Sequence, residues 1–473
     1  MSININLFVK NIQLCTYLVV IQKIFFESLT DNKYMIWESL SPGQEIALLL
    51  VVVASLLWIT EIIPLHITSF VILFVELVWL LPELKKVNST LSSELFLAPF
   101  FSDTILLFLG GFVLAKAANK YGIDSRVARI LLKSKSSNSF KVLLKIVFIT
   151  SLLSMWMNNT ATASLMIGLL MPVMNLVPSE SHRKGLLLAV PFASNIGGIG
   201  TPVGTLPNAI AMEYLRGLGL APSFLEWMLY AVPIMLILNL ALCFILYLFF
   251  FTGSNSKLED LQIFSLEIKE DNRSKKIDQF IIAILVVTIT LWLTSDLHKV
   301  SIGTIALIPV ILLFSTRILD LKDFKSLSWD VLILMGGGIS LGKSIEVSQL
   351  GTALLSPFHA ESFGIFTVIV FFSFATLLLS AIMSNTSVAN LMVPIAIGLG
   401  MFYQDGLVIF VAIAASLSMP LPISTPPNAI AFSFGILKSK EMLYPGICMT
   451  LTAWGLLVSF GYCWMKLLQM GHL

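Results

Sequence analysis

The chain has 473 residues, of which 57% are apolar and 12% charged, and its mean hydropathy is +0.92. Apolar runs of about 20 residues recur along its length, which excludes a soluble domain and predicts an all-α polytopic membrane protein. The alternation typical of a membrane β-barrel is missing. The net charge of +2 carries little information, because the placement of basic residues among the loops is what matters in such a protein. The four cysteines show no metal or redox spacing and are interpreted as apolar helix filler.

The first part of the chain predicts several apolar spans before any polar break. Residues 7–26 are apolar but carry charges and lack a cleavage site, so within the N-terminal segment 1–44 they predict a poor first span or an interfacial helix. Residues 45–64 and 65–81 predict two spans with almost no loop between them. A polar connector leads to a further apolar segment at 104–116, which contains a Gly-Gly pair.

A polar motif, Asn158-Asn159-Thr160, interrupts the next apolar segment, residues 141–175. About 16 residues precede the motif and about 14 follow it, so each helical arm would be ~21–24 Å long, short of the ~30 Å bilayer core. Basic loops flank both ends of the segment. We therefore predict a re-entrant helical hairpin that enters and leaves on one side, with its tip near the membrane midplane.

A second interruption lies in residues 186–212, where glycines and prolines cluster at 197–208. Such clusters end a helix and restart it, so this segment predicts a broken helix. Residues 227–251 predict an uninterrupted span. The hydrophilic, mixed-charge residues 252–276 predict a linker.

The second half repeats this order, which predicts two repeats, residues 45–251 and 277–473. Ser384-Asn385-Thr386 matches the first polar motif at an offset of 385 − 159 = 226, and the Asn428 motif matches that of Asn208 at 428 − 208 = 220. The remaining segments are apolar spans at 277–294, 302–314 and 445–468, a Gly-rich segment at 331–343, a hairpin at 363–399 and a broken helix at 407–434.

The second repeat is predicted to be inverted, because five spans separate the two hairpins if each hairpin returns to its own side. Loops beside the first hairpin hold most Lys and Arg residues, whereas the loops beside the second, 344–364 and 399–406, hold none. The positive-inside rule then puts the first hairpin's mouth in the cytoplasm and the second's outside. Lys85 and Lys86 fall on the outer side and oppose this orientation.

The interruptions also predict a chemistry. An unwound chain in lipid leaves carbonyl and N–H groups without partners, which is costly unless something occupies them. Carbonyls with Asn, Ser and Thr oxygens suit an alkali cation such as Na⁺, and the restarting helices present free N–H groups that suit an anion. Thr160 and Thr386 are predicted N-caps, and Pro426 and Pro427 fit a first helical turn. The combination predicts co-transport of Na⁺ with an anion.

From about residue 45 to its end, the chain resembles the divalent anion:sodium symporter family (solute carrier 13-like). The resemblance rests on the twin Ser-Asn-Thr-type tips, the twin Thr-x-Pro-Asn breaks and the segments 108–112 and 329–338. It implies about 11 transmembrane helices plus two re-entrant hairpins in two inverted repeats. It also implies a homodimer in which a transport subdomain moves against a scaffold subdomain as an elevator.

The resemblance further implies two Na⁺ sites and one substrate site. The cation sites would comprise Ser154, Asn158, Asn159 and Gly204 in the first repeat, and Ser380, Met383, Asn385 and Ser424 in the second. Substrate carboxylates would contact Asn159, Thr160, Thr205, Ser384, Asn385, Thr386 and Thr425. Asn158 stands where the family has Ser. Little changes if Asn158 contributes only its backbone carbonyl, whereas an inward-pointing amide would alter the first cation site or reduce the room for substrate.

Several ionisable residues lie in or near the spans: Glu61, His66, Glu76, Asp103, Lys116, Lys343 and Glu346. Pairing or snorkelling is their ordinary role near span ends. Glu76 is the deepest and the best candidate for a proton-linked role, in a span that the resemblance assigns to the scaffold.

The leading hypothesis is a plasma (inner) membrane transporter, not an enzyme, that couples Na⁺ to a small dicarboxylate such as succinate, malate or fumarate. A sodium-independent dicarboxylate or citrate exchanger and a sulfate transporter are alternatives, because substrate choice depends on pocket width. An intramembrane enzyme lacks support, since neither polar motif has a nucleophile–base pair or metal cluster nearby. An ion channel fits the dead-end hairpins less well than alternating access does. No nucleic-acid partner is expected.

Overall fold

The computed structural model describes residues 40–132, 138–174, 177, 179–252, 275–355, 364–398 and 404–470, and all regular structure in these ranges is helical. The first half contains α2 (Pro42–Thr60), α3 (Leu65–Val75), η2 (Glu76–Leu80), α4 (Leu81–Val87), α5 (Glu94–Leu97), η3 (Ala98–Phe101), α6 (Asp103–Lys120), α7 (Ile123–Leu132), α8 (Ser139–Ser154), α9 (Asn159–Met174), α10 (Glu180–Gly198), α11 (Leu206–Gly217) and α12 (Phe224–Phe250). The second half contains α13 (Lys275–Leu293), α14 (Ser295–His298), α15 (Ile302–Ser315), α16 (Leu321–Lys325), α17 (Trp329–Val347), α18 (Leu350–Leu355), α19 (Ile365–Ser380), α20 (Asn385–Gly398), α21 (Gln404–Ser416), α22 (Pro426–Ser433), α23 (Ser439–Leu456), η6 (Leu457–Gly461) and α24 (Tyr462–Met470). The stretch 7–26 and most of the linker 252–276 lie outside the described residues.

Six helical segments in the described ranges are long and apolar enough to cross a membrane. They are Pro42–Thr60, Leu65–Val87, Glu94–Lys120, Phe224–Phe250, Lys276–Leu293 and Ser439–Leu468. Large apolar side chains on these segments point outward, among them Phe74, Leu240 and Phe244. Lipid tails solvate such faces, whereas water would not. The chain is therefore an integral, multi-pass membrane protein, as its composition predicts.

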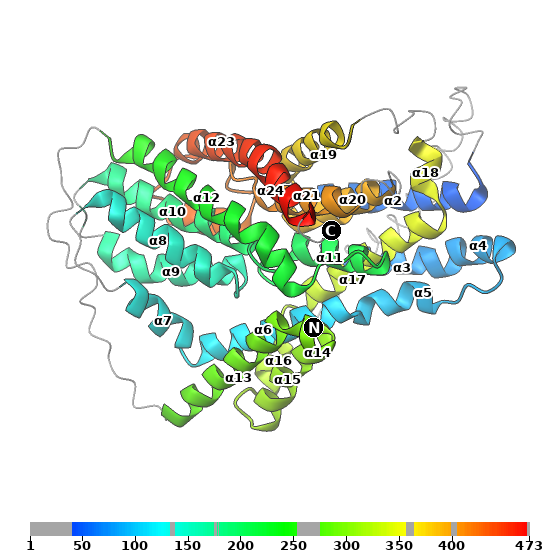
Figure 1. Cartoon of the computed structure of the whole chain (residues 1–473), viewed down its shortest axis with the longest axis horizontal. Helices are drawn as coiled ribbons and strands as arrows, with labels where there is room; N and C mark the ends of the chain where they lie inside the picture. The colour runs from blue at the N-terminus through cyan, green and yellow to red at the C-terminus, as the bar shows by residue number, and fades with distance from the viewer. Residues whose placement is uncertain are drawn as a thin grey trace, which may run out of the picture.

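Four shorter helices form two pairs that meet at the polar motifs. Helices α8, α9 and α19 have 16 residues each and α20 has 14, so each is ~21–24 Å long, less than the ~30 Å core. Helix α8 packs against α9, and α19 packs against α20 (Figure 1). The breaks and the short arms are thus where the sequence predicts them.

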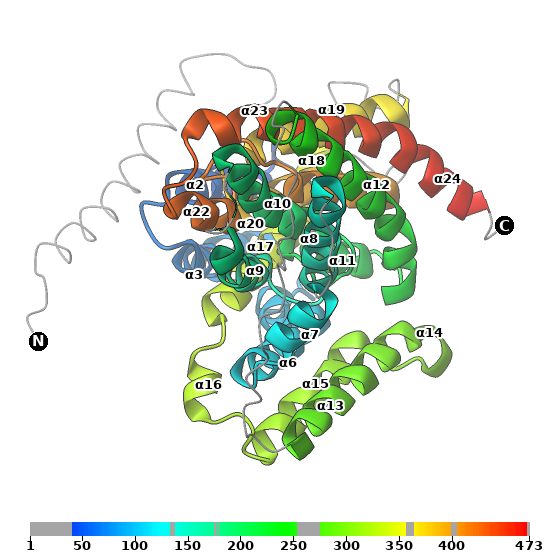
Figure 2. The same ribbon diagram turned by 90° about the vertical axis from the view of Figure 1, so that its left-hand side faces the viewer.

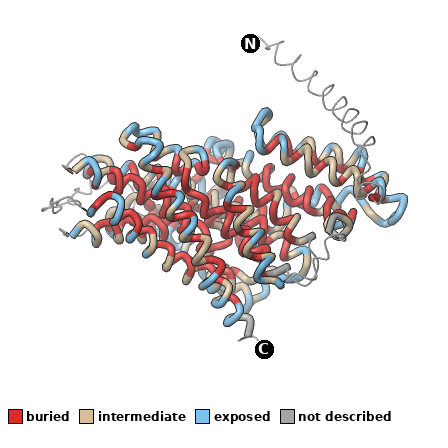
Figure 3. The backbone as a smooth tube through the Cα atoms, turned by 90° about the horizontal axis from the view of Figure 1, so that it is seen from above, coloured by how far each residue is buried: buried red, intermediate tan, exposed pale blue. Residues whose placement is uncertain are grey.

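The two halves of the chain interlock around the broken helices. Helix α10 packs against both α8 and α9, and α21 packs against both α19 and α20. Each restarting helix then crosses to the other half, because α11 packs on α20 and α21 while α22 packs on α9 and α10. This exchange brings the two hairpin tips and the two breaks together, and Figure 3 shows that the buried residues fill the middle of the molecule.

The predicted N-caps Thr160 and Thr386 are wrong. Helix α9 begins at Asn159, and Asn158 Oδ1 accepts a hydrogen bond from the backbone N–H of Thr160 at 2.8 Å. Helix α20 begins at Asn385, and Ser384 Oγ, two residues before the predicted cap, accepts a hydrogen bond from the backbone N–H of Ser387 at 3.2 Å. A capping oxygen has to precede the first free N–H groups, and both threonines lie inside the first turn. The prediction for Pro426 is confirmed, since α22 begins there.

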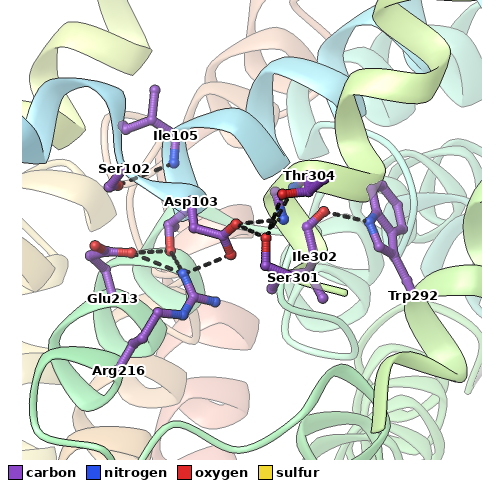
Figure 4. Close-up of polar contacts among 11 residues, drawn as sticks. Ser102, Asp103, Ile105, Glu213, Arg216, Trp292, Ser301, Ile302 and Thr304 are labelled. Carbon is purple, nitrogen blue, oxygen red and sulfur yellow. Dashed lines mark hydrogen bonds and ion pairs between the residues drawn. The ribbon is translucent and has the colours of Figure 1, made fainter. Parts of the chain in front are cut away.

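A charged cluster ties α11 to α6 and α15 (Figure 4). Arg216 Nη1 lies 3.1 Å from Asp103 Oδ2, 3.2 Å from Glu213 Oε2 and 3.0 Å from Thr104 Oγ1. Asp103 Oδ1 accepts the hydroxyl proton of Ser301. Helices α13 and α15 lie to one side of the main body in both ribbon views and pack chiefly through α6 (Figure 2), so this cluster is one of the links between them and the broken helix.

Candidate functional site

One cavity of about 470 Å³ is lined by both hairpin tips and both breaks. The tips contribute Asn158, Asn159, Thr160, Ser384, Asn385 and Thr386, and the breaks contribute Gly204, Thr205 and Thr425. All the residues predicted to contact substrate therefore line a single space. Of the residues predicted to hold cations, Asn158, Asn159, Gly204 and Asn385 line the cavity, whereas Ser154, Ser380, Met383 and Ser424 are buried outside its lining.

At the first tip, three oxygens converge on the side chain of Asn159. In one orientation of its amide, Oδ1 faces the carbonyls of Ser194 and Gly204 at 3.2 Å with no donor between them. With the amide reversed, its nitrogen donates to both carbonyls and to Ser154 Oγ at 2.8 Å. The reversed orientation is the one that gives all three oxygens a donor. Two carbonyls and a hydroxyl are oxygen ligands of the kind that bind an alkali cation.

The second tip repeats these contacts. Ser380 Oγ lies 2.8 Å from Asn385 Oδ1 and 2.6 Å from the carbonyl of Ala415, as Ser154 Oγ lies 2.8 Å from the carbonyl of Ser194. Ser424 Oγ donates to the carbonyl of Ala381 at 3.1 Å. These oxygens are neutral, and no group of three or more His, Cys, Asp or Glu in the described ranges could hold a metal ion. Any cation here would be held by hydroxyl, amide and carbonyl oxygens.

The asparagines of the two breaks have a structural role that the sequence analysis missed. Asn208 Nδ2 donates to the carbonyls of Gly198, Ile199 and Thr201 at 2.8–3.3 Å. Asn428 Nδ2 donates to the carbonyls of Met419 and Leu421, both at 3.1 Å. Both side chains are fully buried, where an unpaired carbonyl is costly. Each asparagine therefore holds the unwound backbone of its own break, and the matched spacing of the two Thr-x-Pro-Asn motifs was the signal that could have shown it.

Each break forms a hydrogen bond with the long helix of the other half of the chain. Asn195 Nδ2 of α10 donates to Thr425 Oγ1 at 3.1 Å, and Ser416 Oγ of α21 lies 3.5 Å from Thr205 Oγ1. Asn195 and Ser416 occupy matching positions, at an offset of 416 − 195 = 221. Asn195 also lines the cavity and was not predicted. Each break is thus positioned by the long helix of the opposite repeat.

The cavity is lined by the starts of several helices and by few ionisable groups. Among the described residues no Lys or Arg lines it, and its titratable groups are His66 and Asp330, neither of which was predicted as a site residue. Helices α9, α11, α20 and α22 all begin beside it. Their free N–H groups and positive dipole ends attract negative charge, but partial charges do not neutralise a dianion. Bound monovalent cations would supply the missing positive charge.

Comparison with known proteins agrees with the motifs and the geometry. Residues 36–470 match the model of the sodium:sulfate symporter transmembrane region. The chain belongs to the divalent anion:sodium symporter family. It is 30% identical over 428 residues to a sodium-dependent dicarboxylate transporter, SdcS, of Staphylococcus saprophyticus, covering 83% of this chain and 81% of that one. Its resemblance to a member of this family, found from the residues, is confirmed.

The chain is also similar to two further relatives and to one solved structure. An uncharacterized transporter of Schizosaccharomyces pombe is 32% identical over 440 residues, which cover 88% of this chain but only 49% of the relative. An uncharacterized transporter of Haemophilus influenzae is 29% identical over 451 residues, covering 90% of this chain and 93% of that protein. Among solved structures, Neisseria gonorrhoeae MtrF is similar at a TM-score of 0.52 and 14% identity, covering 77% of this chain and 82% of MtrF. That likeness concerns the fold alone.

Proposed function

We propose that this protein is a secondary active transporter that moves a small C4-dicarboxylate, such as succinate, malate or fumarate, together with Na⁺ across the plasma membrane. The observation that carries the proposal is the single cavity lined by both polar tips and both breaks, with neutral amides and hydroxyls as its principal polar groups. A volume of about 470 Å³ lies in the range of small-molecule sites. The sodium-dependent dicarboxylate transport named for the relatives in Staphylococcus supports the same substrate class.

In the proposed site, one set of residues binds the cations and another binds the substrate anion. Na⁺ binds at Ser154, Asn158, Asn159 and Gly204, and at Ser380, Met383, Asn385 and Ser424. The substrate carboxylates bind at Asn159, Thr160, Thr205, Ser384, Asn385, Thr386 and Thr425. Because cation and anion share Asn159 and Asn385, each charge stabilises the other, and neither binds well alone. This linkage is the physical basis of symport.

The proposed movement is an elevator-type alternating access within a homodimer. The two hairpins and the two broken helices form one interlocked body, so they would move together as a transport subdomain. The links of α11 to α6, α15 and α17 would slide or break during this movement. Inverted repeats would give the inward and outward states related geometries.

Uptake of labelled succinate by proteoliposomes tests the proposal. We expect uptake only with an inward Na⁺ gradient. Equal uptake in choline would exclude coupled symport, and uptake that needs dicarboxylate inside the vesicles would show an exchanger. Competition by unlabelled sulfate but not by malate or fumarate would show a sulfate transporter.

A further inference from the structure

Glu76 is a fully buried carboxyl group in a membrane-spanning segment, remote in sequence from the cavity motifs. It lies near the middle of the apolar segment Leu65–Val87, and its side chain has no exposed surface. The helix changes from α to π at this residue, where η2 begins. Single π turns inside helices are frequent at functional sites, and ionisable groups within the membrane are costly unless they serve a purpose. Glu76 does not line the cavity.

The partners of Glu76 are hydroxyl groups of α17. Ser344 Oγ donates to Glu76 Oε1 at 2.7 Å, and Ser340 Oγ is hydrogen-bonded to Oε2. Ser340 Oγ also lies 3.2 Å from the carbonyl of Phe96. A serine has one hydroxyl proton and cannot give it to both acceptors. All these contacts are satisfied together when Oε2 carries a proton, donates it to Ser340 Oγ, and Ser340 donates to Phe96.

No described cation compensates a charge on Glu76. The titratable groups on the elements packed around it include Glu45 of α2, His66 of α3, Glu94 of α5, Tyr214 of α11 and, on α4 and α17, Glu83, Lys85, Lys86, Asp330, Lys343 and Glu346. Within the described ranges none of them forms an ion pair with Glu76: Lys343 pairs with Glu346 at 2.8 Å and Lys86 with Glu83. The Tyr214 hydroxyl donates to the carbonyl of Gly338. A carboxylate in this setting would be buried with two neutral donors only, which favours the protonated acid.

Helix α17 connects this carboxyl to the elements that form the cavity. Two residues before Ser340, its Gly338 carbonyl accepts the Tyr214 hydroxyl of α11 at 2.6 Å. Gly338 also touches the side chain of Asn390 in α20 so closely that a Cβ would collide with it. Helix α11 starts at the first break and α20 starts at the second polar motif, and both starts line the cavity. A change in how α17 packs against Glu76 therefore affects the contacts that α17 makes with α11 and α20.

We propose that Glu76 is a proton-binding site, separate from the substrate cavity, whose protonation permits the movement of α11 and α20 against α17. The second part of this inference rests on the proposed transport function. Loss of the proton to water leaves a negative charge between α17 and its neighbours. The Ser340 hydroxyl then donates to the carboxylate of Glu76 instead of to the Phe96 carbonyl. The interface between α17 and the helices around Glu76 has to admit water or separate.

The test compares the wild-type protein with Glu76→Gln, which keeps the shape and neutrality of the protonated acid. Glu45→Gln is the matched control, since Glu45 lies on the neighbouring helix α2 and, within the described ranges, forms no hydrogen bond with Ser340 or Ser344. We expect the infrared band of a buried protonated carboxyl in the wild-type protein and in Glu45→Gln, and its loss in Glu76→Gln. This readout needs no transport, so failure of the proposed function would leave it intact.

The second readout is the pH profile of Na⁺-driven succinate uptake between about pH 5.5 and about pH 8.5. We expect wild-type uptake to fall several-fold toward the alkaline end, and Glu76→Gln to stay within about twofold across the range. A Glu76→Gln profile that matches the wild type, or an infrared band that survives the substitution, would overturn the proposal. If Glu76→Gln does not fold, Ser344→Ala should shift the band and the profile, and a variant unchanged in both would overturn it equally.

Discussion

The two breaks of this protein have matching contacts but are built from different residues. In each, a serine hydroxyl joins the asparagine of a hairpin tip to a carbonyl of the long helix, and an asparagine of the break holds unwound carbonyls. Where the first break has Gly198 and Gly204, however, the second has Ser418 and Ser424, at the same offset of 220. The two breaks thus share a geometry of contacts although their residue types differ.

The two breaks differ in the groups that hold their unwound backbone in place. In the first, the backbone itself approaches closely: a Cβ on Gly204 would collide with the Gly198 carbonyl, and one on Gly198 would lie 2.6 Å from the Asn159 amide. In the second, side chains replace this approach, since Ser424 Oγ bonds both to the Ala381 carbonyl and to the backbone N–H of Leu421. The first proposed cation site would therefore draw on the backbone carbonyls of its break, and the second on the Ser424 hydroxyl.

The largest effect should come from the asparagines that the two repeats share. Replacing Asn159 by Ala leaves the carbonyls of Ser194 and Gly204 without a donor, and replacing Asn385 by Ala removes a partner of Ser380 Oγ, at ~1–3 kcal/mol for each unsatisfied group. Each variant also loses a proposed ligand of both cation and substrate, so we expect succinate uptake to drop at least about a hundredfold. Asn88→Ala, in an exposed loop, is the control and should transport normally. Uptake near wild type in both tip variants would remove the proposed site.

Replacing Gly204 of the first break by serine, the residue at the matching position of the second break, should reduce uptake nearly as much. Gly204→Ser puts a side chain against the Gly198 backbone, and such overpacking costs ~1–3 kcal/mol, so folded yield and uptake should both fall. Gly168→Ser in α9 is the matched control, because a Cβ there meets nothing within 4 Å. A Gly204→Ser protein with normal yield and uptake would show that the repeats are interchangeable here.

The threonines of the breaks should differ in their contribution to stability. Thr425 Oγ1 accepts from the backbone N–H of Asn428 and from Asn195, whereas Thr205 has no side-chain cap bond and one contact at 3.5 Å. Thr425→Val should cost ~1 kcal/mol, and Thr205→Val a few tenths. The midpoints of thermal unfolding in detergent check this order, and equal midpoints would contradict it.

The smallest effect should come from Asn158→Ser, which gives the first tip the capping residue of the second. Asn158 Oδ1 is occupied by the N–H of Thr160, and Asn and Ser are comparable N-caps. Na⁺-dependent uptake should stay within about twofold of wild type. A large change in Na⁺ dependence would mean that the Asn158 side chain acts as more than a cap.

Much of the fold could be predicted from the sequence because the length and polarity of each segment follow directly from its own residues. Hairpin arms too short to cross a bilayer, and breaks marked by glycine and proline, are local properties. The shared cavity was predictable only because both motifs are duplicated, which implies that they meet. The N-caps were misplaced by two residues because Asn158, Thr160, Ser384 and Thr386 all have capping oxygens, and composition does not say which one precedes the first turn.

The parts that could not be predicted depend on contacts between distant segments. Asn195 reaches Thr425 across 230 positions, and Arg216 reaches Asp103 across 113 (216 − 103). His66 and Asp330 line the cavity through helices outside both polar motifs. Nothing in the sequence near these residues marks their partners, since the contacts arise from the packing of helices that are distant in sequence, such as α22 on α10 and α11 on α6.

The most direct measurement of the central claim is equilibrium binding of labelled succinate to the purified protein with and without Na⁺. If both tips form one site that holds cation and dianion together, the wild-type protein should bind succinate only in Na⁺, and Asn159→Ala and Asn385→Ala should each lose this binding while remaining folded. Binding that is equally tight in choline, or that survives in both variants, would contradict the account.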